Sequence, residues 1–153
     1  MDSNAICVHV RRGDYVVRGA CSPAYFARAV NEILARTGWK RATAFVFSDD
    51  MEWCRSSLRF DPPAGVDLRV DYVDINDSDA PVFEMELMRG CRHYVLSTGG
   101  FGYMASVLSV SKEESIVIWP DENRADDWCL EWSSRTQPAS ASPPPRVILY
   151  QPR

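Results

Sequence analysis

Long apolar segments and lysine are both scarce in this sequence of 153 residues. No apolar run approaches the ~18 residues that a membrane-spanning helix requires, and no signal peptide precedes the first predicted strand. We therefore expect that a targeting element is either absent from this chain or was lost with missing upstream sequence. Lysine occurs only at Lys40 and Lys112, and the net charge is −4. Nucleic-acid-binding domains are usually basic, so this balance argues against a nucleic-acid partner.

Several common motifs are also missing. No phosphate-binding Gly-x-x-x-x-Gly-Lys-Ser/Thr loop is present, which excludes a P-loop nucleotide hydrolase by pattern. No Gly-x-Gly-x-x-Gly follows the first predicted strand, and no Gly-x-Ser-x-Gly elbow occurs, so neither classical dinucleotide binding nor a hydrolase triad is supported. The five cysteines include no Cys-x-x-Cys pair, and the two histidines lack metal-ligand spacing. We therefore expect no metal site and no disulfide framework.

The chain instead contains short β-branched runs that alternate with helical patterns. Strands are expected at Ala5–Arg11, Ala42–Phe47, Asp67–Val73, Tyr94–Leu96 and Ser115–Trp119. This alternation predicts an α/β, Rossmann-like parallel sheet with helices on both faces. Residues 1–134 are interpreted as one domain. Residues 135–153 are interpreted as a Pro/Ser-rich tail in which 146–150 form either an edge strand or a disordered end.

Turn and capping residues place the helices between these strands. Ser22 is a suitable N-cap before Pro23, and Gly38 is expected to end that helix. Asp49 is the expected cap of a short second helix that reaches about Leu58. Pro81 is expected to open a third helix, on which Phe83, Leu87 and Cys91 share one face, and Phe101–Leu108 reads as a fourth helix.

Polar residues gather where the predicted strands end. His9, Arg11, Arg12 and Asp14 lie at the end of the first strand, Ser48, Asp49 and Asp50 at the end of the second, and Ser97, Thr98, Gly99 and Gly100 at the end of the fourth. Ligands bind at the carboxyl ends of parallel strands, so three separate loops are expected to converge on one crevice.

Two of these loops suit a phosphate. The guanidiniums of Arg11 and Arg12 can each make charge-assisted bonds to a diphosphate. Because side chains alternate along a strand, we expect one of them to face the ligand and the other to pair with a carboxylate such as Asp14. Thr98-Gly99-Gly100 precedes a helix, so it is either a tight turn or an anion site built from free N–H groups.

Three segments together are similar to the motifs of a known enzyme family. His9–Tyr15 resembles the His-x-Arg-Arg-x-Asp-Tyr signature of α-1,2-fucosyltransferases, glycosyltransferase family 11. Phe47–Cys54 resembles the second motif of the family. Phe83–His93, followed by Ser97–Tyr103, resembles the third, so the resemblance covers roughly Ile6 to Pro120.

The resemblance implies the C-terminal, donor-binding half of a GT-B glycosyltransferase, with residues 1–134 as a GDP-fucose-binding domain. It implies that Arg11 binds the β-phosphate, that His9 lies at the guanosine end, and that Arg12 helps to hold the pyrophosphate or the loop. Glu84 would recognise the guanine, and the 97–100 loop would contribute to donor binding. Family members need no metal, and guanidiniums with helix N–H groups can stabilise the departing GDP instead.

The implied reaction transfers L-fucose from GDP-fucose to a hydroxyl of a galactose-containing glycan in α-1,2 linkage, with inversion at C1. Arg11 and Asp14 are the candidate catalytic residues. Asp14 would act as the general base or, in a more ordinary role, pair with an arginine. An N-terminal acceptor domain does not fit before the first strand, so we expect that half in a missing segment or a partner chain. Relatives from eukaryotes are Golgi membrane proteins and bacterial ones are cytoplasmic, which leaves the compartment open.

Three positions depart from the family pattern and keep alternatives open. Glu84 stands where relatives commonly carry Asp, Gly100 where they carry Thr or Ser, and Met104 where they carry Trp. One alternative is another GDP-fucose-dependent fucosyltransferase, and a second is a non-catalytic GDP-sugar-binding domain. A flavodoxin-like module is more distant, because no hydroxyl-rich phosphate loop follows the first strand.

Overall fold

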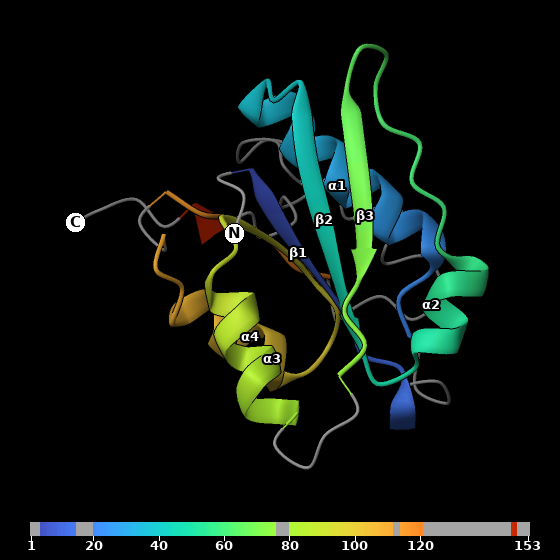
Figure 1. The fold of residues 1–153 in the computed structure, drawn as a ribbon, viewed down its shortest axis with the longest axis vertical. Coiled ribbons are helices and arrows are strands. Elements are labelled where there is room, and N and C mark those ends of the chain that lie inside the picture. The colour runs from blue at the N-terminus through green and yellow to red at the C-terminus, as the bar shows by residue number, and fades with distance from the viewer. Residues whose placement is uncertain (1–3, 15–19, 76–79, 112–113, 121–147, 150–153) are drawn as a thin grey trace, which may run out of the picture.

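The computed structural model describes residues 4–14, 20–75, 80–111, 114–120 and 148–149, which form an α/β fold (Figure 1). Its sheet has the strand order β3-β2-β1-β4-β5-β6, in which β1 to β5 are parallel and β6 is antiparallel to β5. The strands are β1 (Ala5–Val10), β2 (Arg41–Ser48), β3 (Asp67–Tyr72), β4 (His93–Leu96), β5 (Ile116–Ile118) and β6 (Ile148–Leu149). The helices are α1 (Pro23–Thr37), α2 (Met51–Ser57), α3 (Ala80–Arg89) and α4 (Gly100–Val107). The predicted α/β class with a parallel, Rossmann-like sheet is confirmed.

The sheet is covered on both faces. Figure 1 shows α1 and α2 on one side of it and α3 and α4 on the other. All six residues of β1 are buried: Ile6 and Val8 pack in the cluster that includes α1, whereas Ala5 and Cys7 pack in the cluster that includes α3 and α4. Side chains that alternate along β1 thus supply both layers of the core, which explains why its sequence is almost entirely apolar.

Local signals fix the ends of the first two helices. The Ser22 hydroxyl accepts the N–H of Tyr25 at the start of α1, and Gly38 ends it with a φ of 68°. Both features agree with the sequence. In α2, however, the N-cap is Asp50, which accepts the N–H of Trp53, so the expected cap at Asp49 is wrong by one residue. Asp49 instead binds the loop that follows β1.

The apolar face expected for α3 does not face the core. Phe83 and Leu87 remain 51% and 37% exposed, whereas Met88 is fully buried. The carbonyl of Met88 accepts a hydrogen bond of 2.8 Å from the Tyr94 hydroxyl of β4, which ties this side of α3 to the sheet. Cys91 is buried but lies beyond the end of the helix.

The tail predicted for residues 135–153 falls largely outside the described residues. Within it, Ile148–Leu149 pair with β5 as β6, inside the range for which the sequence left an edge strand open. Among the helices that the structure describes, none is long and apolar enough to cross a membrane.

A buried histidine at the start of β4 predicts how stability depends on pH. His93 is 4% exposed, stacks on Trp39, and its Nδ1 accepts the N–H of Ile116 at 3.0 Å. Burial, followed by the charge of Arg92, lowers the pKa of His93 from 6.5 to about 4. The unfolded chain therefore binds more protons than the folded chain between these two values, so this histidine makes stability fall as the pH decreases through that window.

We expect the His93→Asn variant to show a shallower loss of stability between pH 6.5 and 4, because the amide oxygen can replace Nδ1 as acceptor without titrating. The difference should approach about 3 kcal/mol at the acidic end. Urea unfolding across this range measures it. Parallel stability profiles for the two proteins would show that His93 does not titrate as described.

Candidate functional site

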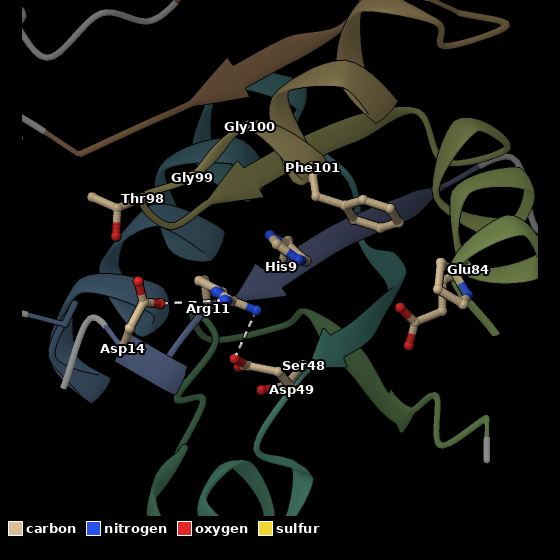
Figure 2. Close-up of a pocket in the computed structure, with 11 residues that line it drawn as sticks. His9, Arg11, Asp14, Ser48, Asp49, Glu84, Thr98, Gly99, Gly100 and Phe101 are labelled. Carbon is tan, nitrogen blue, oxygen red and sulfur yellow. Dashed lines mark hydrogen bonds and ion pairs between the residues drawn. The ribbon is translucent and has the colours of Figure 1, made fainter. Parts of the chain in front are cut away.

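The carboxyl ends of β1, β2 and β4 surround one open cavity of about 500 Å³ (Figure 2). From β1 the chain continues to β2 and β3 on one side of the sheet, and from β4 it continues to β5 on the other side. The point between β1 and β4 where the direction reverses is where doubly wound sheets bind ligands. The lining residues are His9, Arg11, Asp14, Ser48, Asp49, Pro81, Glu84, Thr98, Gly99, Gly100 and Phe101.

Arg11 lies at the centre of this cavity wall. Its Nη1 is 3.0 Å from Asp49 Oδ2 and its Nη2 is 3.2 Å from Asp14 Oδ1. Its backbone N–H donates to the Ser97 hydroxyl, which links the loop after β1 to the end of β4. Because 42% of the Arg11 side chain remains exposed, its guanidinium can still reach a ligand in the cavity.

Arg12 turns away from the cavity. Its Nε is 3.2 Å from Asp50 Oδ2, and its guanidinium carbon lies 3.8 Å from the centre of the Trp53 ring. One arginine thus faces the cavity and the other pairs with a carboxylate, as the alternation predicted. The example given for that carboxylate was wrong, because Asp14 pairs with Arg11 and Asp50 pairs with Arg12.

The N-terminus of α4 opens toward the cavity without a side-chain cap. Its N-cap is Gly99, whose φ of 112° is a conformation that favours glycine. The first N–H groups of a helix have no partner within the helix and attract anions. The neighbouring Thr98 hydroxyl is buried and has no hydrogen-bond partner within the described part of the chain. A ligand oxygen would satisfy both kinds of donor.

His9 is buried and held neutral. Burial is the main cause that lowers its pKa from 6.5 to about 4; the Arg11 charge lowers it further and the Asp49 charge opposes the shift. Its ring lies 5.9 Å from that of Phe101, between centroids. A Cβ on Gly102 would come within 2.7 Å of His9 Nδ1, so α4 can approach this ring only because it carries glycine there.

Glu84 of α3 lies across the cavity from Asp14 and Thr98, with His9 and Arg11 between them (Figure 2). Partial burial, followed by the charge of Asp49, raises the pKa of Glu84 above its usual value. The cavity therefore has a part near Arg11 and α4 that is rich in N–H donors, and a separate carboxyl, Glu84, at the other end.

Most of the predicted site residues meet here. His9, Arg11, Asp14, Glu84, Thr98, Gly99 and Gly100 all line the cavity, whereas Arg12 and Ser97 do not. Ser97 supports the Arg11 backbone instead. Ser48 and Asp49 were noted as polar strand ends but not assigned to the site, and Pro81 and Phe101 were missed. The strand-end rule placed the loop of Asp49 at the expected crevice, but no sequence signal identifies Pro81. Within the described residues, no group of three metal-binding side chains is found.

Comparisons with known proteins agree with these motifs. Residues 1–134 match the family model described as Glycosyl transferase family 11. The chain is 26% identical over 113 residues to an Alpha-1,2-colitosyltransferase of Escherichia coli, 31% over 114 residues to Galactoside 2-alpha-L-fucosyltransferase Sec1 of Mus musculus, and 34% over 112 residues to Galactoside alpha-(1,2)-fucosyltransferase 1 of Lagothrix lagotricha. These matches cover 69%, 70% and 67% of this chain but only 37%, 29% and 28% of the relatives. The chain thus spans about a third of their length, and no solved structure matches it.

The contact between α4 and His9 predicts that alanine at Gly102 and alanine at Gly100 change the stability of the fold differently. Glycine to alanine within a helix normally stabilises by roughly 0.5–1 kcal/mol. In Gly102→Ala, however, the new Cβ would also lie 3.1 Å from Leu96 Cδ2 and 2.7 Å from the His9 ring. Overpacking typically costs about 1–3 kcal/mol, so the net effect should be a loss of about 1–2 kcal/mol.

Gly100→Ala is the matched control, because a Cβ at Gly100 meets no atom within 4 Å. Urea unfolding should show that this variant is as stable as the original chain or slightly more stable. Equal stabilities for the two alanine variants would contradict the close packing of α4 on His9.

Proposed function

This chain belongs to glycosyltransferase family 11, and on that premise we propose that its cavity is the donor site of a fucosyltransferase. The proposed reaction transfers L-fucose from GDP-fucose to a galactoside hydroxyl in α-1,2 linkage, with inversion at C1. One observation carries the proposal: Arg11, the uncapped start of α4 and Glu84 all face the same cavity at the switch point of the sheet.

The diphosphate fits the end near Arg11 and Thr98. A guanidinium has five N–H donors, so Arg11 retains donors for phosphate oxygens beyond its contacts with Asp14 and Asp49. The buried Thr98 hydroxyl has no hydrogen-bond partner among the residues that the structure describes, and it would donate to an oxygen beside the first N–H groups of α4. Together these groups can stabilise the negative charge on GDP as it leaves, which supports a reaction that proceeds without a metal.

The guanine fits the end near Glu84. The N1–H and the 2-amino group of guanine are adjacent donors, and the two oxygens of one carboxylate can accept both. The Phe101 ring next to His9 offers an apolar surface at the same part of the cavity. Uracil and adenine lack this pair of donors, so the arrangement favours a guanine nucleotide.

In the proposed reaction the acceptor oxygen forms a bond to C1 of fucose while the bond from C1 to the β-phosphate oxygen breaks. GDP takes the electron pair of the broken bond, and a base takes the hydroxyl proton. Asp14 remains a candidate for that base. In the structure it is ion-paired with Arg11, which is the more ordinary of the two roles predicted for it.

The acceptor would be bound largely by residues that this chain does not contain, either in an N-terminal acceptor domain or in a partner chain. This follows from the proposal because the matched segments are 28–37% of the relatives' length. The same observation favours a second candidate function, a GDP-sugar-binding domain without transferase activity of its own. GDP binding without transfer to any galactoside would distinguish it.

We expect the purified chain to bind GDP more tightly than UDP or ADP, and Arg11→Ala to lose most of this affinity because the main charged contact to the diphosphate disappears. Isothermal titration calorimetry measures the affinities. A thermal shift supports them, since a ligand at 100 times its Kd stabilises the folded state by about 2.7 kcal/mol.

Arg41→Ala is the matched control. Arg41 begins β2, at the end of the strand that is opposite the cavity. Its side chain is 80% exposed and pairs with Asp67, so its loss should leave GDP binding unchanged. If the original chain binds none of the three nucleotides, or binds all three equally, the assignment of the cavity to a GDP-sugar is wrong.

Thr98→Val should lower GDP affinity without lowering the stability of the free protein. Valine has nearly the same shape and removes a buried hydroxyl that has no partner in the described residues, so the free protein should be unchanged or more stable. GDP affinity should fall about 2- to 10-fold, the equivalent of one hydrogen bond worth ~0.5–1.5 kcal/mol.

Thr37→Val is the control of opposite sign. The Thr37 hydroxyl donates to the Ile33 carbonyl at the end of α1, so its loss should destabilise the fold without affecting GDP. Unfolding and calorimetry on both variants decide the matter. Unchanged GDP affinity in Thr98→Val would exclude this hydroxyl from the donor site.

A further inference from the structure

Asp49 contacts the loop after β1 through both of its carboxylate oxygens. Oδ1 accepts the backbone N–H of Arg12 at 2.8 Å, and Oδ2 lies 3.0 Å from Nη1 of Arg11. We propose that Asp49 is the positioning residue that fixes the Arg11 guanidinium at the cavity wall, and that Gly13 is glycine to permit this contact. The inference rests on the proposed function, because it concerns the arginine assigned there to the diphosphate.

The register of the sheet brings these residues together. Val10 and Ser48 are partners in the parallel ladder between β1 and β2, so the residues that follow them lie side by side. Asp49 therefore reaches Arg11 from a different strand and ties the loop to the end of β2. Only 27% of the Asp49 side chain is exposed, which limits the freedom of its carboxylate.

Asp14 is less suited to this positioning role, although it also pairs with Arg11. It lies three residues further along the same loop, so it moves with the group that it would have to fix. Arg11 Nη2 donates a hydrogen bond to it at 3.2 Å, but the Asp14 side chain is 62% exposed, and an exposed pair of this kind contributes little to stability. Of these two carboxylates, Asp49 is therefore the one that can hold Arg11 in place when a ligand enters.

Gly13 leaves the space that Asp49 occupies. A Cβ at this position would come within 2.7 Å of Asp49 Oδ2 and 3.3 Å of Arg11 Nη2. The requirement is one of space, because the φ angle of Gly13 is not in the positive region. Alanine at this position would push the carboxylate and the guanidinium apart without changing the charge of either group.

If only charge mattered, removal of a carboxylate from the cavity would strengthen the binding of an anionic ligand. Asp14, Asp49 and Glu84 all line the cavity, so removal of any one carboxylate reduces the repulsion of a diphosphate. Asp14→Asn and Asp49→Asn remove the same charge from the same guanidinium. If Asp49 positions Arg11, the two variants should change GDP affinity in opposite directions, and Gly13→Ala should resemble Asp49→Asn.

The first test uses NMR on the free chain and needs no ligand. The Nε–H signal of Arg11 is assigned by its absence from Arg11→Lys, and its ¹⁵N–¹H heteronuclear NOE measures the order of the guanidinium. We expect this NOE to be high in the original chain and in Asp14→Asn, and to fall in Asp49→Asn and in Gly13→Ala. An unchanged NOE in Asp49→Asn would overturn the proposal, whatever the chain binds.

The second test compares GDP with guanosine by calorimetry. Asp49→Asn and Gly13→Ala should each weaken GDP binding about tenfold but leave guanosine binding unchanged, because Arg11 would contact only the phosphates. Asp14→Asn should bind GDP as tightly as the original chain or more tightly. The double variant Gly13→Ala/Asp49→Asn should be no weaker than Asp49→Asn, because both changes break one contact.

The outcomes separate the two proposals. A loss of both GDP and guanosine binding in Asp49→Asn would mean a general structural role, and equal effects of Asp14→Asn and Asp49→Asn would mean that only charge matters; either result overturns the positioning role. Asp74→Asn controls for the chemistry of the change, since Asp74 pairs with Arg55 after the next strand and does not line the cavity. If the original chain binds no GDP while the Arg11 NOE responds as expected, the donor assignment fails and the positioning of Arg11 stands.

Discussion

The parallel pairing of β1 with β2 on one side and β4 on the other is the constraint on which the rest of the structure depends. A strand in this position is buried on both faces and must be apolar until it reaches its carboxyl end. The chain then leaves the sheet in opposite directions, with α1 and α2 on one face and α3 and α4 on the other. The helices on neither face fill the space between the end of β1 and the end of β4, and the cavity lies in that space.

Two glycines allow the backbone of α4 to pack closely beside the cavity. Gly99 gives the turn its conformation, and Gly102 lets α4 lie directly against His9. No side chain of the described residues caps α4, so its first N–H groups are available to an anion beside the cavity. The same packing keeps His9 neutral down to a pH of about 4, so its imidazole offers one donor and one acceptor rather than a positive charge.

The sequence predicted the order and type of the main elements because their signals are local: β-branched runs, Ser22 before Pro23, and Gly38. It also predicted that the loops after β1, β2 and β4 would meet, because the carboxyl ends of parallel strands lie at the same end of a sheet. It could not predict which way Arg12 turns, since its partners Asp50 and Trp53 lie about 40 residues away in sequence. The shift of the cap from Asp49 to Asp50 has the same origin, as Asp49 is engaged by the loop after β1. Periodicity likewise placed Phe83 and Leu87 on one face of the third helix but did not show that Met88 is the buried residue, because tertiary contacts decide which side of a short helix is covered.

The charge balance of the cavity limits what can bind there. Three carboxylates and one guanidinium line it, so a free diphosphate would meet net repulsion from the side chains alone. One feature reduces that repulsion: Asp49 is already paired with the Arg11 guanidinium and accepts the N–H of Arg12. The remaining attraction has to come from fixed donors, namely the N–H groups of α4 and a guanidinium that cannot turn away. A site of this kind depends on geometry more than on charge, and it would select a ligand whose phosphates and base reach both ends of the cavity at once.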